Sequence, residues 1–331
     1  MPVLRNSLWI SAAALSALTN PGCGHVSERA GFAPTASASA AAPETHAQRF
    51  AAPAPPPSET GGFDGNAAFA HVAKLVSFGP RPPGSDNIHR AQNYIQTQLR
   101  SFGCTVDLDD FHGQTPIGEL PMENMVAKVP GTGQGIILLL THYDTARKKD
   151  FLGAEDGGSS TGLMLEMARL LCIKKNQPNA VWIAFLDGEE AQVEWTETDS
   201  VYGSRELAAR LAVSRDLKRI RAALLADMIG QNDLEIAREA NSTKWLTDLV
   251  WNTAARLGYG SIFVSREMTI DDDHVPFLRR GVPAVDIIDF DGFQPYWHTP
   301  QDTLDKVSPR SLAIVGHVIF ESVSELQNKF R

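Results

Sequence analysis

Residues 136–144 read Ile-Ile-Leu-Leu-Leu-Thr-His-Tyr-Asp, an uninterrupted apolar run that ends in an imidazole and a carboxylate. Three further apolar runs of strand length lie at residues 180–186, 222–226 and 284–288. Strands that are buried on both faces lack the alternation of apolar and polar residues seen in half-exposed strands. The four runs therefore predict a central, mainly parallel sheet that other elements cover on both faces.

Helical periodicity separates these runs and flanks them. Apolar side chains recur at helical spacing in residues 66–78, 87–102, 161–173, 205–212, 242–257 and 308–330, and shorter strand-like runs lie at residues 124–129 and 262–264. Apolar strands that alternate with helices indicate the α/β class. We therefore expect a three-layer α/β/α sandwich with a central mixed, mostly parallel sheet, formed by one catalytic domain over residues 63–331.

Composition excludes several kinds of partner and site. The chain has 331 residues and a formal net charge of −9, which argues against nucleic acid as a main partner because phosphate binding requires a basic surface. It has only three cysteines and no Cys-x-x-Cys, so a disulfide framework and a cysteine-ligated zinc site are excluded. Cys104 and Cys172 fit either two buried thiols or a single disulfide. Nothing in the sequence indicates an oligomer, and we expect a monomer.

The N-terminus resembles an export signal. Arg5 gives a positive start, residues 8–18 are apolar, and Gly22-Cys23 follows. Glycine before cysteine suits lipidation at Cys23, whereas a plain secretory peptide or an unprocessed membrane anchor explains residues 1–23 equally well. Residues 24–62 are rich in alanine and proline and predict a disordered linker. We expect a protein of the bacterial periplasm or cell envelope that touches the membrane only through this N-terminal segment.

The ends of the predicted strands carry ionisable side chains. In open α/β sheets the ligand site lies beyond the carboxyl ends of the strands. The residues that follow the four runs are His142 and Asp144, then Asp187, Glu189 and Glu190, then Asp227, and finally a loop with Trp297 and His298. So many acids at one edge would repel each other unless a cation were present.

Zinc is the cation that suits these side chains, because it binds imidazole nitrogen and carboxylate oxygen. The available ligands are His142, Asp156, Glu190, Asp227 and His298. Each of them alone has an ordinary structural explanation, such as a helix cap, a turn or a packed core pair. Their conjunction at strand ends predicts a metal site, and an adjacent carboxylate such as Glu189 is then free to act as general acid and base.

Longer motifs resemble the glutaminyl cyclases of the animal type, within the zinc-dependent aminopeptidase superfamily with a phosphorylase/hydrolase-like fold. These motifs are Phe-Leu-Asp-Gly-Glu-Glu-Ala at residues 185–191 with the downstream Trp195, and Tyr-Gly-Ser-Arg at 202–205. Asp-Asp-His-Val-Pro-Phe-Leu-Arg-Arg-Gly-Val-Pro at 272–283 and Trp-His-Thr at 297–299 match as well. The resemblance extends from about Phe69 to the C-terminus.

The resemblance implies a reaction and a role for each site residue. The enzyme would be an acyltransferase that converts N-terminal glutamine of peptides or proteins to pyroglutamate and releases ammonia. One zinc ion would be held by Asp156, Glu190 and His298, with Glu189 as proton shuttle. Asp227 and Asp272 would form a hydrogen-bond network with Glu189, and the pocket walls would be Trp195, Trp297 and Phe293.

The sequence also departs from the animal pattern. Thr141 and Thr161 occupy the positions of a disulfide near the zinc loop, and Asp286 stands where a histidine is expected. The loop at residues 289–296 is one residue longer, which affects the assignment of Phe293. These differences bear on the range of substrates.

Two other functions remain open from the residues alone. In a secreted zinc aminopeptidase, His142 and Asp227 would bind a second zinc ion and Asp156 would bridge the two metals. In an envelope-tethered binding protein, the ancestral site would be inactive, but the intact Glu189 counts against this interpretation.

Overall fold

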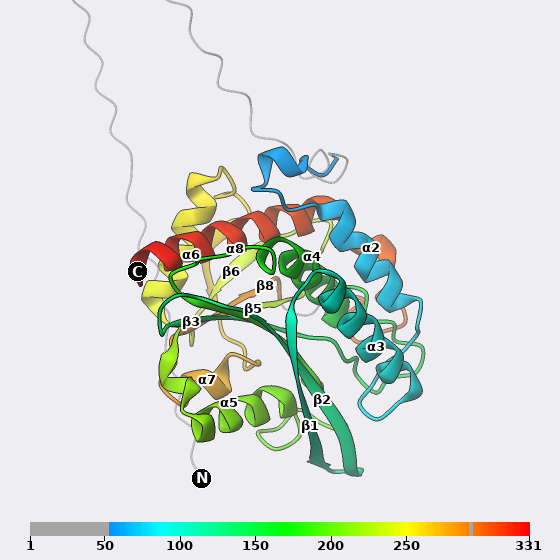
Figure 1. The fold of residues 1–331 in the computed structure, drawn as a ribbon. Coiled ribbons are helices and arrows are strands. Elements are labelled where there is room, and N and C mark those ends of the chain that lie inside the picture. The colour runs from blue at the N-terminus through cyan, green and yellow to red at the C-terminus, as the bar shows by residue number, and fades with distance from the viewer. Residues whose placement is uncertain (1–52, 291–293) are drawn as a thin grey trace, which may run out of the picture. The chain divides into compact units, whose positions relative to one another are not determined.

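The computed structural model describes residues 53–290 and 294–331. In these residues a six-stranded sheet has the order β1-β2-β4-β3-β5-β8, and β6 and β7 form a separate pair (Figure 1). The strands are β1 (Thr105–Thr115), β2 (Gly118–Val129), β3 (Ile136–His142), β4 (Ala180–Leu186), β5 (Ile220–Asp227), β6 (Ile236–Glu239), β7 (Phe263–Met268) and β8 (Ala284–Ile288). The longer helices are α2 (Gly65–Val76), α3 (Asp86–Ser101), α4 (Ser160–Leu171), α5 (Tyr202–Ser214), α6 (Lys244–Arg256) and α8 (Pro309–Lys329), and α7 (Val275–Leu278) is one turn.

The large sheet is mixed, with its parallel part at the centre. β4, β3, β5 and β8 run parallel, whereas β2 is antiparallel to both β1 and β4. Parallel neighbours end at the same edge of the sheet, so the residues that follow β3, β4 and β5 come together. The fold class predicted from the sequence is confirmed.

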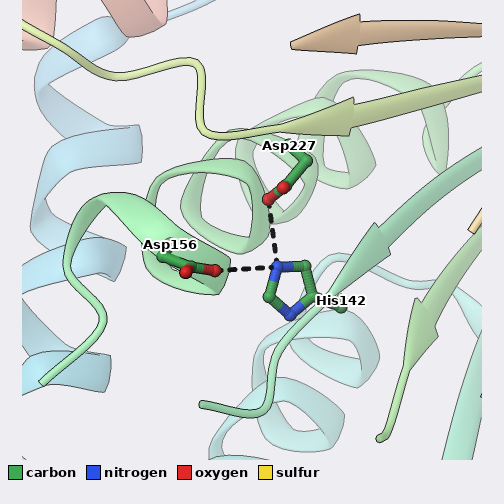
Figure 2. Close-up of side chains that lie close together, drawn as sticks. All are labelled: His142, Asp156 and Asp227. Atoms are coloured by element: carbon green, nitrogen blue, oxygen red, sulfur yellow. Dashed lines mark hydrogen bonds and ion pairs between the residues drawn. The ribbon is translucent and has the colours of Figure 1, made fainter. Parts of the chain in front are cut away.

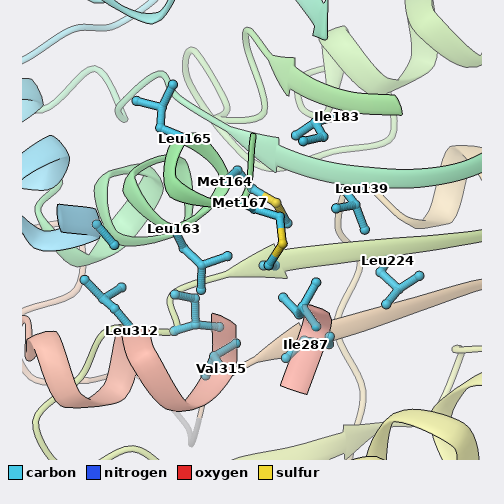
Figure 3. Close-up of a cluster of buried hydrophobic side chains, with 14 of the residues drawn as sticks. Leu139, Leu163, Met164, Leu165, Met167, Ile183, Leu224, Ile287, Leu312 and Val315 are labelled. Atoms are coloured by element: carbon cyan, nitrogen blue, oxygen red, sulfur yellow. The ribbon is translucent and has the colours of Figure 1, made fainter. Parts of the chain in front are cut away.

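Helices cover both faces of this sheet (Figure 1). α2, α3, α4, α6 and α8 lie on one face, and α5 and α7 lie on the other. In β3, Ile137 and Leu139 face the first group, whereas Leu138 and Leu140 face the second, as the two-residue period of a strand requires. Figure 3 shows the larger core, where Met164 of α4 and Val315 of α8 pack against the sheet. Because all seven residues of β3 and of β4 are buried, the site at their ends rests on a rigid base.

A disulfide joins Cys104 to Cys172. Cys104 lies a short turn after α3, and Cys172 caps the C-terminus of α4, so the bond ties the ends of these two helices together. The sequence had left these two cysteines open between thiols and a disulfide. The two cysteines are 68 residues apart in the sequence, so the bond closes a long loop. A closed loop of that length restricts the unfolded chain and stabilises the fold.

The structure differs from the sequence prediction at three elements. β1 and the first part of β2 form a hairpin with many exposed residues, and it was not predicted because it lacks an apolar run. Residues 262–264 were expected in the main sheet, but β7 pairs with β6 instead. Residues 57–62 were assigned to the linker, yet Thr60 is fully buried and its hydroxyl donates to the carbonyl of Phe63 at 2.6 Å.

The predicted leader and most of the predicted linker fall in residues 1–52, which lie outside the described residues. No helix in the described part of the chain is both long enough and apolar enough to span a bilayer.

Candidate active site

Three parallel strands bring ionisable side chains together at one edge of the sheet. His142 ends β3, Asp227 ends β5, and Glu189 and Glu190 follow β4 after a short turn. A cavity of about 460 Å³ lies at this edge, and Glu189, Glu190 and Asp227 line it together with Asp156. The structure therefore brings together residues that are far apart in the sequence, as the strand-end argument predicts.

Asp156 projects from a tight turn over Glu155–Ser159, in which the backbone of Asp156 and Gly157 is not helical. The next residue, Gly157, has a φ of 73°, and a Cβ there would lie 2.6 Å from the carbonyl oxygen of Asp144, so only glycine fits. Asp302 fixes the turn from outside, since its two carboxylate oxygens accept from the backbone N–H groups of Glu155 at 2.8 Å and Asp156 at 3.1 Å. The sequence did not indicate this role for Asp302, which lies only four residues after His298.

A fully buried arginine holds the loop that leads to this turn. The Arg81 guanidinium donates to the carbonyl oxygens of Tyr143 at 2.7 Å, Leu152 at 2.7 Å and Gly153 at 2.9 Å. Burial lowers the pKa of Arg81 to about 10, although Asp144, Asp302, Asp156 and Glu190 oppose this decrease. Arg81 remains charged at neutral pH and offsets part of the negative charge around the site.

Asp156, Glu190 and His298 converge as a set of metal ligands. The Nε2 atom of His298 lies 3.2 Å from Asp156 Oδ2 and 3.0 Å from Glu190 Oε1, and one ligand atom from each residue lies within 4.8 Å of the others. Ligands bound tetrahedrally to zinc at about 2.0–2.1 Å lie roughly 3.3 Å from one another. One nitrogen and two carboxylate oxygens at this spacing fit a catalytic zinc site with an open fourth position.

Aromatic rings hold His298 in place. Trp297 stacks on its ring with centroids 3.8 Å apart, and the buried Phe151 meets it edge-on at 5.5 Å. The backbone of His298 has a φ of 54°, an uncommon conformation for a residue other than glycine. Such strain is tolerated where the surroundings fix the conformation, and here it directs the imidazole toward Asp156 and Glu190.

Asp144 positions the two glutamates through their backbone. Its carboxylate accepts from the N–H of Glu189 at 3.1 Å and from that of Glu190 at 3.4 Å. Burial raises the pKa of Glu189 well above its usual value; His142 opposes this change, while Asp272, Glu190 and Asp273 add to it. A buried carboxyl that lines the cavity and is not part of the three-ligand set is suited to proton transfer.

His142 lies close to several carboxylates, and Figure 2 shows those of Asp156 and Asp227 beside it. Its Nε2 atom is 3.0 Å from Asp227 Oδ1 and 3.4 Å from Asp156 Oδ1, and its Nδ1 atom is 3.9 Å from Glu189 Oε2. These contacts connect Asp227 to Glu189 through His142. The resemblance implied a hydrogen-bond network of Asp227 and Asp272 with Glu189. His142, Asp156 and Asp227 also place ligand atoms within 4.8 Å of one another, so they form a second group with the geometry of a cation site.

Asp272 belongs to a second cluster of buried acids. Asp272, Asp273 and Asp286 are buried, and each has at least one carboxylate oxygen without a hydrogen-bond partner in the described residues. Burial raises the pKa of Asp272 to about 7, and it raises the pKa values of Asp273 and Asp286 well above the usual range. Only Asp271 of this acidic run is exposed, so the run is not a solvated turn. Nearby, His274 contacts Glu239 at 3.1 Å and has a structural role.

Two of the three predicted pocket walls line the cavity. Trp195 and Trp297 both face it, and Trp195 remains 42% exposed. Phe293 falls in residues 291–293, outside the described part of the chain. Phe290, which the sequence did not single out, lines the cavity and meets Trp297 edge-on at 5.4 Å.

Comparisons with known proteins agree with this arrangement. Peptidase family M28 matches residues 124–323 of the chain. The glutaminyl-peptide cyclotransferase of Drosophila melanogaster is 30% identical over 266 residues, which cover 71% of this chain and 75% of that protein.

Solved structures give the same result. A glutaminyl cyclase from an Acidobacteriales bacterium has a TM-score of 0.77 and 39% identity, over 81% of this chain and 96% of that one. A Zn-dependent exopeptidase from Parabacteroides distasonis has a TM-score of 0.74 and 27% identity, over 79% and 98%. The chain belongs to peptidase family M28 and, within that family, to the glutaminyl-peptide cyclotransferases.

Proposed function

We propose that this protein converts the N-terminal glutamine of peptides or proteins to pyroglutamate and releases ammonia, with one zinc ion bound by Asp156, Glu190 and His298. The observation that carries the proposal is the position of Glu189. Its carboxyl is buried, lines the cavity beside those three ligands and has its pKa raised well above the usual value. A group with these properties can move a proton at the reacting atoms.

The chain's own residues account for the proton transfers. When bound, zinc supplies Lewis-acid polarisation of the side-chain amide carbonyl of the substrate. Glu189 accepts a proton from the α-amine of the substrate as that nitrogen attacks the amide carbon. Glu189 then returns the proton to the departing nitrogen, so that the C–N bond of the side-chain amide breaks and ammonia leaves. The proton count balances without a further co-reactant.

The cavity favours the intramolecular reaction over hydrolysis. The nucleophile and the carbonyl belong to the same residue, so the protein mainly has to hold that residue in a reactive conformation. Trp195, Trp297 and Phe290 supply bulky apolar walls, and apolar area predominates in the cavity lining. These walls restrict the space for a water molecule to attack in place of the amine.

Glu189→Gln tests the proposal. We expect kcat for ammonia release from Gln-Ala amide to decrease by about a hundred- to ten-thousandfold, because the proton acceptor is lost, while the zinc content stays unchanged. Glu194→Gln is the matched control, since Glu194 is exposed and does not line the cavity. Unchanged cyclisation by Glu189→Gln would contradict the proposed mechanism.

A two-zinc aminopeptidase is the alternative that one observation favours. The second group of ligand atoms, from His142, Asp156 and Asp227, would hold the second ion. Metal analysis of the purified protein, together with assays for ammonia release and for free amino acid release, distinguishes the two functions. One zinc per chain and ammonia release support the cyclase, whereas two zinc ions and release of amino acids would support the peptidase.

We also propose that the protein is exported to the bacterial cell envelope. The Cys104–Cys172 disulfide supports export, because disulfides persist in oxidising compartments. The intact mass of the mature protein from the envelope fraction tests this proposal. A chain that begins at Cys23 with added lipid mass would identify a lipoprotein, and an uncut chain in the cytosol would contradict export.

A further inference from the structure

A second cavity lies beside the active-site cavity. Its volume is about 320 Å³, and Trp195, Asp271 and Asp272 line both cavities. Trp195 therefore stands at the boundary between them, with 42% of its surface exposed. A peptide whose first residue occupies the active-site cavity has this second cavity within reach of the residues that follow, because each extended residue spans about 3.3–3.6 Å.

The wall of the second cavity carries three arginines, and none of them lines the first cavity, whose basic side chains are Lys148 and His298. Arg205 of α5, and Arg279 and Arg280 directly after α7, line only the second cavity. Arg279 is paired with Glu197 at 3.0 Å. The acidic residues shared by the two cavities, Asp271 and Asp272, lie at their common wall.

Neither Arg205 nor Arg280 forms a salt bridge in the described part of the chain, although the charge of Asp199 acts on Arg205. The Arg280 guanidinium donates to the carbonyl of Pro276 at 3.1 Å, and that of Arg205 donates to the carbonyl of Thr198 at 3.2 Å. The Nε atom of Arg205 is buried without a hydrogen-bond partner. Both guanidinium groups therefore keep donors for a ligand.

Arg205 is also held in a fixed position. Its guanidinium lies over the ring of Tyr202, 4.7 Å from the ring centroid. A planar guanidinium that is already oriented loses little conformational entropy when it binds, and its paired N–H groups match the two oxygens of a carboxylate. The chemistry of this wall therefore favours an acidic ligand.

We propose that the second cavity binds the peptide segment after the N-terminal glutamine, and that Arg205 and Arg280 select an acidic side chain at the second or third residue. This inference rests on the proposed function. The net charge of −9 makes the protein as a whole repel acidic peptides, so a preference for them has to arise locally. The preferred substrates are thus peptides that begin with glutamine and continue with glutamate or aspartate.

Two series of C-terminally amidated tripeptides test the inference, Gln-Xaa-Ala and Gln-Ala-Xaa, with glutamate, glutamine or lysine as Xaa. The terminal amide removes the only other carboxylate. We expect kcat/KM for ammonia release to be about three- to fivefold higher with glutamate than with glutamine in at least one series, mainly through KM, because exposed ion pairs have this strength. High salt should reduce the ratio toward one.

Variants identify the groups responsible. Arg280→Gln combined with Arg205→Gln should abolish the preference for glutamate, and Arg280→Glu alone should shift it toward lysine. Circular dichroism shows whether the double variant is folded, and the exposed Arg280 gives an independent single variant. The matched control is Arg90→Gln, at an exposed position on α3 outside both cavities.

Equal kcat/KM values for the glutamate and glutamine peptides in both series would overturn the inference, and so would a preference that persists in the double variant. Failure to release ammonia from any peptide, Gln-Ala-Ala amide included, would instead overturn the proposed function and the inference with it.

Discussion

Members of two groups of buried carboxylates raise the pKa of Glu189. The two groups differ in whether a bound cation can neutralise their negative charge. Asp156 and Glu190 converge on His298, with ligand atoms within 4.8 Å. Asp272 and Asp273 form the second group with Asp286, and in the described residues no three-ligand arrangement of this spacing includes them. Burial alone therefore does not create a metal site, because convergence of the ligand atoms is required as well.

The difference shows two ways of keeping acids in a protein interior. Charged carboxylates that share a cation remain ionised, since the cation replaces the lost hydration. Carboxyls without a cation bind protons instead, and their pKa values rise. Asp286 is an example of a carboxyl that binds a proton. Both of its oxygens lack a hydrogen-bond partner in the described residues, and burial raises its pKa well above the usual range.

The largest expected effect comes from the first group. Asp156→Asn removes one negatively charged ligand, so we expect zinc to be lost and kcat/KM for cyclisation to decrease by about a thousandfold or more. Metal analysis after dialysis, together with an ammonia-release assay, measures both. Asp273→Asn is the matched variant in the second group and should keep its zinc. Equal zinc loss in the two variants would show that the distinction between the groups is wrong.

A smaller effect is expected from Asp302, which holds the Asp156 turn without being a ligand. Asp302→Asn weakens the two hydrogen bonds to the backbone of Glu155 and Asp156. We expect zinc affinity to decrease by about ten- to hundredfold, as is typical for residues that orient metal ligands. Competition with a chelator of known affinity measures the change, and wild-type affinity in this variant would count against the positioning role of Asp302.

The sequence predicted the core of this arrangement because its signals are local. The central strands are continuous apolar runs, and of the candidate ligands His142 ends one strand and Glu190 follows another after a short turn, whereas Asp156 and His298 lie in longer loops. Rules for parallel sheets then place strand ends at a common edge. All six predicted helices are present, and the comparisons confirm the family resemblance.

The remaining features depend on contacts between distant segments. Arg81 and Asp302 lie 75 and 146 residues from Asp156, on opposite sides of it in the sequence, and no local pattern marks either as a support of its loop. The β1 hairpin lacked an apolar run, and the pairing of Cys104 with Cys172 required the packing of α3 near α4. Hydrogen bonds to backbone groups, such as those of Asp144, also leave no signature in the sequence.

The smallest expected effect concerns Asp286 in the second group and appears as a pH dependence of stability. Burial raises the pKa of Asp286, and the nearby carboxylates of Asp272, Asp227 and Glu239 raise it further, although His274 lies 3.7 Å away. The folded protein therefore keeps this carboxyl protonated at pH values where the unfolded chain ionises it. Folding takes up a proton, so the group lowers the free energy of unfolding as the pH rises above about 4.

Asparagine is neutral at every pH, so the substitution Asp286→Asn removes this decrease in the free energy of unfolding. We expect Asp286→Asn to raise the free energy of unfolding by more than about 1 kcal/mol near pH 8, because one pKa unit corresponds to about 1.4 kcal/mol, with the gain vanishing toward pH 4. Urea unfolding across this range measures it. Asp248→Asn is the control with the opposite sign, since Lys244 and Arg238 lower the pKa of the partly exposed Asp248. A gain for Asp286→Asn that did not change with pH would mean that this carboxyl is ionised in the folded protein, and the second group would then require a cation after all.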